Sequence, residues 1–291
     1  MSTDAEVYNI VNSLSSHPIL LFIHVSGVTL LIIDWLFTLD IELVNAWGGV
    51  WNKGRTLYFL TRYSAFFDAP IMLYYNMAVS VPPLLCARLY LVASTLSIFG
   101  IVVAELIMTI RVWALWGRRR DIGIVLITAA FVNGMAAIVI YSIRQSSQYV
   151  VMGHLSSAIP GCFPIAMTDF TTAWPFVPLA THQTIVFLLT AVKGIQHYRN
   201  RVYGSSLIDT FYRDGITYYA LLFALSIANI AATPQFHTAA PSFLTSLQRT
   251  AHSILSARML LHLRQGFQQP NSREDQARIS IAIVLVGLGR K

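Results

Sequence analysis

The sequence predicts an all-α integral membrane protein, built as a seven-transmembrane-helix bundle with its N-terminus outside and its C-terminus in the cytoplasm. The 291 residues are 55% hydrophobic and only 11% charged, whereas soluble proteins carry about 25% charged residues. Apolar runs of about twenty residues, the length that crosses a bilayer as a helix, recur along the chain. Basic residues gather in alternate connections between these runs, as expected for a multi-pass protein.

Seven apolar runs are expected to form the spans. They cover residues 18–39, 56–80, 89–116, 122–143, 174–193, 215–233 and 241–263. The last run contains two arginines, a glutamine and two histidines, so it can span a membrane only if most of its surface packs against other helices. The run Ile279–Leu288 is about ten residues long, too short to cross a bilayer.

The distribution of charge sets the predicted orientation. With the N-terminus outside, fourteen of the 20 Lys and Arg residues lie in cytoplasmic segments, two lie in outer segments, and four lie within helices. Cytoplasmic loops carry such an excess of basic residues, and the anionic lipid surface accounts for the net charge of +7 without nucleic-acid binding. The chain is therefore expected to comprise an outer segment 1–17, a membrane domain 18–263 and a cytoplasmic tail 264–291.

The stretch 104–121, AELIMTIRVWALWGRRRD, concentrates the charges of the third run. Glu105 lies inside the apolar helix, where placing a carboxylate costs free energy. Such a residue is expected to have a bonding partner or a functional role. The arginine triplet that follows Gly117 marks a cytoplasmic end. Together with the basic connection 194–214, this triplet provides the expected surface for a cytoplasmic partner. The arginines of that surface are Arg118, Arg119, Arg120, Arg199 and Arg201.

Charged side chains within the spans are expected to pair, because an unpaired charge in the membrane is expensive. Depth along each helix, at about 1.5 Å per residue, predicts two clusters. One cluster lies near the inner end and joins Asp34 to Arg62 or Arg111. The other lies at mid-depth and joins Asp68 and Glu105 to Arg249. These pairs could be structural clamps or a switchable lock or relay, and the inner arginines could instead extend to the interface. The predicted network comprises Asp34, Arg62, Asp68, Glu105, Arg111 and Arg249.

The two cysteines, Cys86 and Cys162, both fall in segments assigned to the non-cytoplasmic side, where disulfides persist. A bridge between them would tie the long outer connection to the top of the third helix and restrict its freedom. The alternative is that both are unpaired small residues.

Motifs for common enzymatic sites are missing from the sequence. The histidines are scattered without metal-ligand spacing, and there is no phosphate-binding loop and no nucleophile motif. The last predicted helix contains no lysine to carry retinal, which argues against a light-driven pump. We therefore expect a protein that is not an enzyme and that holds no cofactor or metal.

The opening of the chain resembles a family of uncharacterised membrane proteins abundant in mushroom-forming fungi. The runs IIDWLFTLDIELVNAW and LYFLTRY resemble its N-terminal domain, which has no known function and would cover about residues 20–68. Ile33 departs from the pattern, which usually has an aromatic residue there. The later runs ELIMTIRVWALWGRRR and SILSARMLLHLR, and the two outer cysteines, extend the resemblance over most of residues 20–264. The matching residues of the opening domain are Asp34, Leu36, Thr38, Glu42, Trp47, Arg62 and Tyr63.

The resemblance implies a seven-helix fungal membrane protein and implies no activity. The anatomy favours a receptor-like sensor in the plasma membrane or an endomembrane, coupled to a cytoplasmic signalling protein such as a G-protein α subunit. A transporter or channel is the second interpretation, with Asp68, Glu105 and Arg249 as a relay near the midplane. A purely structural membrane protein, in which the charges only clamp the helices, is the third.

Overall fold

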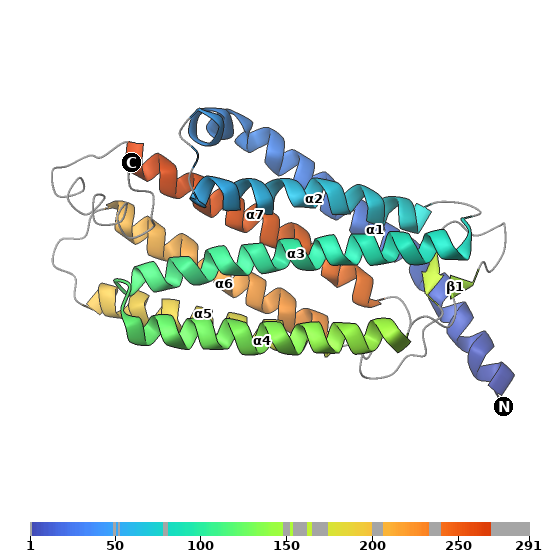
Figure 1. The fold of residues 1–291 in the computed structure, drawn as a ribbon. Coiled ribbons are helices and arrows are strands. Elements are labelled where there is room, and N and C mark those ends of the chain that lie inside the picture. Colours follow the sequence, from blue (N-terminus) through green and yellow to red (C-terminus); the bar gives the residue numbers. More distant parts are fainter. Residues whose placement is uncertain are drawn as a thin grey trace.

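The computed structural model describes residues 2–48, 51, 53–77, 81–147, 152–153, 162–164, 174–199, 206–232 and 240–268. Within these residues the chain forms seven α-helices, each roughly antiparallel to the next, so that α1 begins at one end of the bundle and α7 finishes at the other (Figure 1). The helices are α1 (Ser2–Glu42), α2 (Lys53–Met77), α3 (Pro83–Leu115), α4 (Arg120–Ser147), α5 (Phe176–Arg199), α6 (Ser206–Ala232) and α7 (Ala240–Gln268). A π-helical turn, η1 (Leu43–Trp47), extends α1, and two short strands, β1 (Met152–Gly153) and β2 (Phe163–Pro164), pair antiparallel.

Each predicted run overlaps one helix, and each helix extends beyond its run at one end or both. The largest difference is at α1, which begins at Ser2 rather than at residue 18, so the expected outer segment 1–17 continues the first helix. Hydropathy detects only the portion of a helix that suits hydrocarbon, so it misses polar helical turns of this kind.

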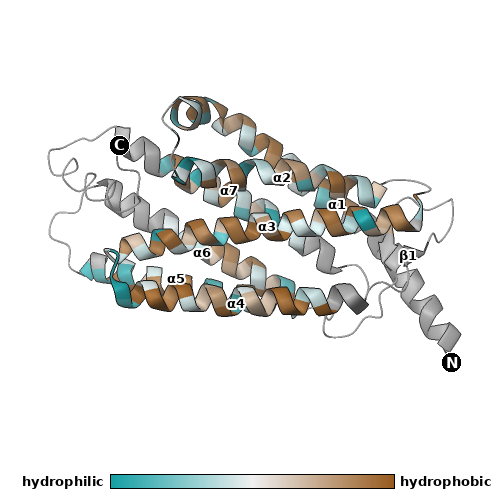
Figure 2. Ribbon diagram, viewed as in Figure 1, coloured by the Kyte–Doolittle hydropathy of each residue, from teal (hydrophilic) through white to brown (hydrophobic). Residues whose placement is uncertain are grey.

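Five of these helices are long and apolar enough to cross a membrane, whereas the sequence had predicted seven spans. Figure 2 shows that apolar residues make up most of α4. Large apolar side chains of α4 such as Ile127, Phe131 and Val132 are more than half exposed, which suits contact with lipid tails. The five helical segments are Leu21–Trp47, Leu84–Leu115, Arg120–Ile143, Phe176–Gln196 and Gly215–Ala232.

The helices outside this set, α2 and α7, carry their polar residues inward. Helix α7 packs against α1, α2, α3 and α6, so its surface is covered by protein on most sides. Its side chains at Gln248, His252, Ser253 and Ser256 are fully buried, as is Arg62 of α2. The least apolar predicted span is therefore an interior helix. Sequence analysis required this, because a run with so many polar residues can span a membrane only if other helices cover most of its surface.

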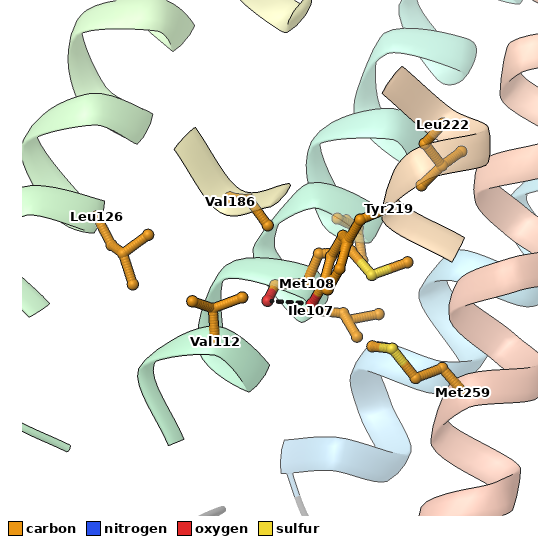
Figure 3. Close-up of a cluster of buried hydrophobic side chains, with 9 residues drawn as sticks. Ile107, Met108, Val112, Leu126, Val186, Tyr219, Leu222 and Met259 are labelled. Atoms are coloured by element: carbon orange, nitrogen blue, oxygen red, sulfur yellow. Dashed lines mark hydrogen bonds between the residues drawn. The ribbon is translucent and has the colours of Figure 1, made fainter. Parts of the chain in front are cut away.

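The main apolar core lies between α3 and its neighbours α4, α5, α6 and α7 (Figure 3). Tyr219 of α6 lies in this core, and its hydroxyl donates to the backbone carbonyl of Met108 at 3.1 Å. Lipid tails are as apolar as these side chains, so close packing stabilises such a core within a membrane. The buried residues of this cluster are Val103, Ile107, Met108, Val112, Leu126, Val186, Tyr219, Leu222 and Met259.

A disulfide joins Cys86, in the first turn of α3, to Cys162, next to β2, with a Cα–Cα distance of 5.8 Å. The backbone N–H of Cys162 also donates to the carbonyl of Tyr75 at 2.9 Å, so this part of the chain is held to both α2 and α3. Cys86 and Cys162 are both buried, together with Tyr75 and Val81. The bridge therefore fixes one end of α3 to a distant point in the sequence.

Replacing both cysteines by serine should lower the free energy of unfolding by about 2–4 kcal/mol, because the bridge closes a long loop in the unfolded chain. The loss can be measured by thermal unfolding of the purified protein in detergent. Wild-type protein that is denatured without reductant should show no reactive thiol in a labelling assay. Modification of both cysteines under these conditions would contradict the bridge.

Candidate functional site

Helix α7 provides one cationic or protonatable side chain for each of three buried carboxylates. The first and last of these side chains are nine residues apart, about 13–14 Å along the helix axis, so the polar groups form a core along the bundle rather than a single cluster. We call these residues and their hydrogen-bond partners the polar core. The three pairs are Arg249 with Asp68, His252 with Glu105, and Arg258 with Asp34.

The end of the polar core nearest to η1 is built around Asp34 of α1. Arg62 of α2 donates to Oδ2 of Asp34 and, at 2.6 Å, to the hydroxyl of Thr38 one turn later on α1. Arg258 of α7 donates to Oδ1 at 2.5 Å. The structure thus pairs Asp34 with the first of its two predicted partners and adds Arg258, which sequence reasoning had missed. The signal for Arg258 was its depth, because the first and seventh helices run in the same direction and Arg258 and Asp34 each lie five residues before the end of their predicted spans.

Arg111 was the other predicted partner of Asp34, and it faces a different helix. A Cβ added to Gly215 of α6 would lie 3.1 Å from Nη2 of Arg111, so the guanidinium is packed against α6. The side chain is buried rather than extended to the interface. Rotation about the axis of α3 decides this, because residues at equal depth can face opposite neighbours.

The turn between α1 and α2 is held by Glu42. Its Oε1 accepts the hydroxyl of Tyr63 at 2.5 Å and the indole N–H of Trp47 at 3.2 Å. Arg55 donates to the backbone carbonyl of Trp47, and its guanidinium lies 4.7 Å from the ring centroid of Trp51. The end of α1, η1 and the start of α2 therefore form a hairpin whose polar side chains bond to one another.

Changing Tyr63 to Phe should lower the free energy of unfolding by about 1–3 kcal/mol, because a buried carboxylate loses its shortest hydrogen bond. Tyr74 to Phe is the matched control, since that tyrosine lies on the same helix and is 53% exposed. Denaturant unfolding in detergent compares the two variants. Equal losses would mean that the Tyr63 hydroxyl does not stabilise the hairpin.

At mid-depth, Asp68 of α2 is bound on two sides. Its Oδ2 accepts Nε–H of Arg249 at 2.9 Å and the hydroxyl of Ser97 at 2.8 Å. Nη2 of Arg249 also donates to Ser64 at 2.7 Å. The guanidinium crosses α3 directly over Gly100, where an added Cβ would lie 2.2 Å from Cζ of Arg249. The prediction that Asp68 and Arg249 come together agrees with this geometry, but the need for Gly100 was not foreseen.

Glu105 was also predicted to pair with Arg249, and this prediction was wrong. Its Oε1 instead accepts from Nε2 of His252 at 2.9 Å and from the amide of Gln183 at 2.7 Å. Glu105 follows Ser97 by eight residues on α3, which places it about 12 Å further along the bundle and beyond the reach of Arg249.

Four hydrogen bonds between side chains lead to Glu105, and each donates in the same direction. Asn229 donates to Gln248 at 2.5 Å, Gln248 donates to Ser226 at 2.6 Å, and Ser226 donates to Gln183 at 2.5 Å. Gln183 then donates to the carboxylate. This chain of donors connects α6, α7 and α5 to α3. Sequence reasoning missed all four donors, although each is a polar residue within an apolar run.

A second histidine lies near the same carboxylate. Nε2 of His182 is 3.8 Å from Oε2 of Glu105 and 3.0 Å from the hydroxyl of Thr109. Among the described residues, no group of three or more His, Cys, Asp and Glu side chains has an arrangement suited to a metal ion. The groups that meet at Glu105 can form hydrogen bonds and transfer protons.

The predicted cytoplasmic surface lies at the α3–α4 turn and the end of α5. Gly117 and Arg118 both have positive φ angles, 64° and 56°, which makes this turn tight. Arg118 lies over the ring of Trp113 at 5.1 Å, and Lys193 of α5 lies over Trp116 at 5.1 Å, which joins the two helix ends. The exposed arginines here are Arg118, Arg119, Arg120 and Arg199. Arg201 lies outside the described residues.

The apolar helices and the polar core define a multi-pass helical membrane protein. Residues 22–67 match a family described as a family of unknown function, DUF6533. This segment coincides with the hairpin of α1, η1 and α2, and it includes Asp34, Glu42 and Arg62. No curated protein and no solved structure is significantly similar to the chain.

Proposed function

We propose that this protein is a receptor-like sensor with seven spans, which passes a signal from its outer end to a partner at its cytoplasmic end. One observation carries the proposal. The polar core links α3, α5, α6 and α7 through a single chain of hydrogen bonds that ends at Glu105. A change in the position of one of these helices would change the bonds of the others, which is what signal transmission through a bundle requires.

Seven spans are supported by the way that α2 and α7 are buried. Their low hydropathy comes from charged residues that are paired with one another or with α1 inside the bundle, as Asp68 is with Arg249. Paired and inward-facing charges are tolerated within a membrane. The charge asymmetry of the connections then supports an outer N-terminus and a cytoplasmic C-terminus, and the fungal resemblance supports a fungal membrane.

The two ends of α3 suit different tasks in this proposal. The disulfide at Cys86 holds the outer end in place, so a ligand bound there would act on a fixed helix. The inner end leads into the exposed arginines of the α3–α4 turn, which can bind an acidic surface of a signalling protein. Arg118, Arg119, Arg120, Arg199 and Arg201 form the proposed surface, and a G-protein α subunit is the proposed partner.

The test is copurification of a G-protein α subunit from native membranes, with and without a non-hydrolysable GTP analogue. Enrichment that the nucleotide releases would support a receptor, and loss of enrichment on changing Arg118, Arg119 and Arg120 to Gln would locate the surface. Arg88 to Gln is the matched control, since this arginine lies at the opposite end of α3. Failure to enrich the subunit in both conditions would favour the alternative below.

A proton-coupled transporter is the second candidate, and the contact of Glu105 with two histidines favours it. A carboxylate and imidazoles within a bundle can carry protons across the middle of a membrane. Substrate-dependent proton flux in proteoliposomes, abolished by Glu105 to Gln and kept by the α4 surface variant Phe131 to Leu, would support this function. Flux that is unaffected by the Glu105 change would exclude a relay through this residue.

A further inference from the structure

The three carboxylate pairs along α7 differ in whether their charge can change. Arg249 and Arg258 keep their protons under any physiological condition, because the guanidinium group is always charged. Histidine is the side chain whose charge ordinarily changes between about pH 5 and 8. Of the three α7 pairs, the pair of His252 with Glu105 is therefore the one that joins a carboxylate to a side chain of this kind.

The hydrogen-bond partners of His252 indicate how many protons this pair holds. Nδ1 lies 2.8 Å from the backbone carbonyl of Gln248, which can only accept, so Nδ1 must carry a hydrogen. Nε2 lies 2.9 Å from Oε1 of Glu105, and it also lies 3.1 Å from the amide nitrogen of Gln183, which donates to the same Oε1. A bond between these two atoms requires one more proton, held either by the imidazole or by the carboxyl group. The pair therefore shares one proton between Nε2 and Oε1.

The chain of donors from α6 favours one position for that proton. The amide of Gln183 donates to the same Oε1, and the hydroxyl of Ser226 donates to the other end of that amide. Reversing the amide would place its oxygen against the carboxyl oxygen and its N–H against a hydroxyl that already receives a donor from Gln248. Bonds to an ionised acceptor are stronger than neutral ones, and aligned donors polarise one another toward it.

We propose that Glu105 and His252 form a proton-binding site at the centre of the bundle, with the proton held by His252 as an imidazolium and Glu105 as the carboxylate. Loss of this proton leaves two lone pairs facing each other at 2.9 Å, with the amide of Gln183 as the donor that remains near both atoms, which weakens the contact between α3 and α7.

Other titratable or charged groups face the site from several helices. His182 of α5 lies 3.8 Å from Oε2 of Glu105 and is held by Thr109. Tyr219 of α6 and Arg111 of α3 lie within electrostatic range of this region. Arg249 of α7 is the nearest cation along the helix, and Asp68 of α2 balances its charge. Arg249 is therefore paired with Asp68, and Arg111 faces α6. His252 is the cation bonded to Glu105.

The first test is nitrogen NMR of the full-length protein in lipid nanodiscs at neutral pH, with 15N-histidine and 13C-glutamate labels. The histidine ring nearest a glutamate carboxyl group identifies His252 without any substitution. Two protonated ring nitrogens are expected, and Glu105 to Gln should convert this ring to a neutral form protonated at Nδ1. His262 to Gln, an exposed position on the same helix, should leave the signal unchanged. A bare Nε2 in wild-type protein would place the proton on Glu105 and overturn the proposal.

The second test measures thermal unfolding across the pH range in which the imidazolium signal disappears. Wild-type protein should lose stability as pH rises through that range, because the α3–α7 contact loses its shared proton. The Glu105 to Gln variant should lose less stability over the same pH range, since the amide of Gln can donate to a neutral imidazole. The same pH course in both proteins would overturn the link between the proton and packing. Neither test involves a cytoplasmic partner, so failure of the receptor proposal would leave both outcomes interpretable.

Discussion

Replacing Arg249 by Met should lower the free energy of unfolding by about 3–5 kcal/mol, the usual cost of leaving one partner of a buried ion pair uncompensated. Asp68 would then keep the hydroxyl of Ser97 but lose its charged partner, at a position where both members of the pair are 3% exposed. Denaturant or thermal unfolding of the purified protein in detergent measures the loss. The yield of monodisperse protein should fall with it, because about 3–5 kcal/mol is a large part of total stability.

The double change of Asp68 to Asn and Arg249 to Met should recover most of this loss. It removes both charges, and the Asn side chain can still bond to Ser97. Arg119 to Met is the control, because its pair with Asp121 is exposed and an exposed pair contributes about 0–1 kcal/mol. A double variant that is no more stable than the single variant would show that the Asp68 charge is not what makes the loss of Arg249 costly.

Changing Gly100 to Ala should destabilise the protein even though alanine is the better helix former. The new Cβ would lie 2.2 Å from Cζ of Arg249, so the guanidinium must move and its bond to Asp68 must break. The expected loss approaches the 3–5 kcal/mol of a broken buried pair, less the roughly 1 kcal/mol that Ala gains over Gly within a helix. Thermal unfolding of the variant in detergent measures the net effect.

A double-mutant cycle separates this mechanism from general crowding of α3. Once Arg249 is Met, the change at Gly100 should cost much less than in wild-type protein, because no guanidinium lies over the glycine. Gly134 to Ala on α4 is the matched control, since an added Cβ there meets no atom within 4 Å. Additive losses in the cycle would contradict the role of Gly100 as the space for Arg249.

Much of the arrangement of helices could be predicted from the sequence. Hydropathy located all seven helices, because burial in lipid requires continuous apolar runs whose length is set by the bilayer. Counting depth along the helices placed Asp34 level with Arg62 and Asp68 level with Arg249, and the structure brings both pairs together. Depth depends only on rise per residue and on antiparallel packing, which are properties of the sequence order.

Other parts of the site depended on information that a sequence read helix by helix does not contain. Arg111 lies at the same depth as Arg62 but faces α6, and Glu105 binds His252 rather than Arg249. Each helix can rotate about its own axis, so two residues at one depth meet only when their helices are neighbours and both side chains point inward. The donors Asn229, Gln248 and Ser226 lie on facing surfaces for this reason.

The sequence by itself determined that this is a helical membrane protein, because composition and the length of apolar runs decide how a chain meets hydrocarbon. Only the tertiary structure decided that α7, the least apolar helix, lies inside the bundle and carries a partner for each of three carboxylates. A charged residue is costly in lipid and acceptable beside an opposite charge. Whether a charged residue is costly or acceptable therefore depends on the side chains that the fold places beside it.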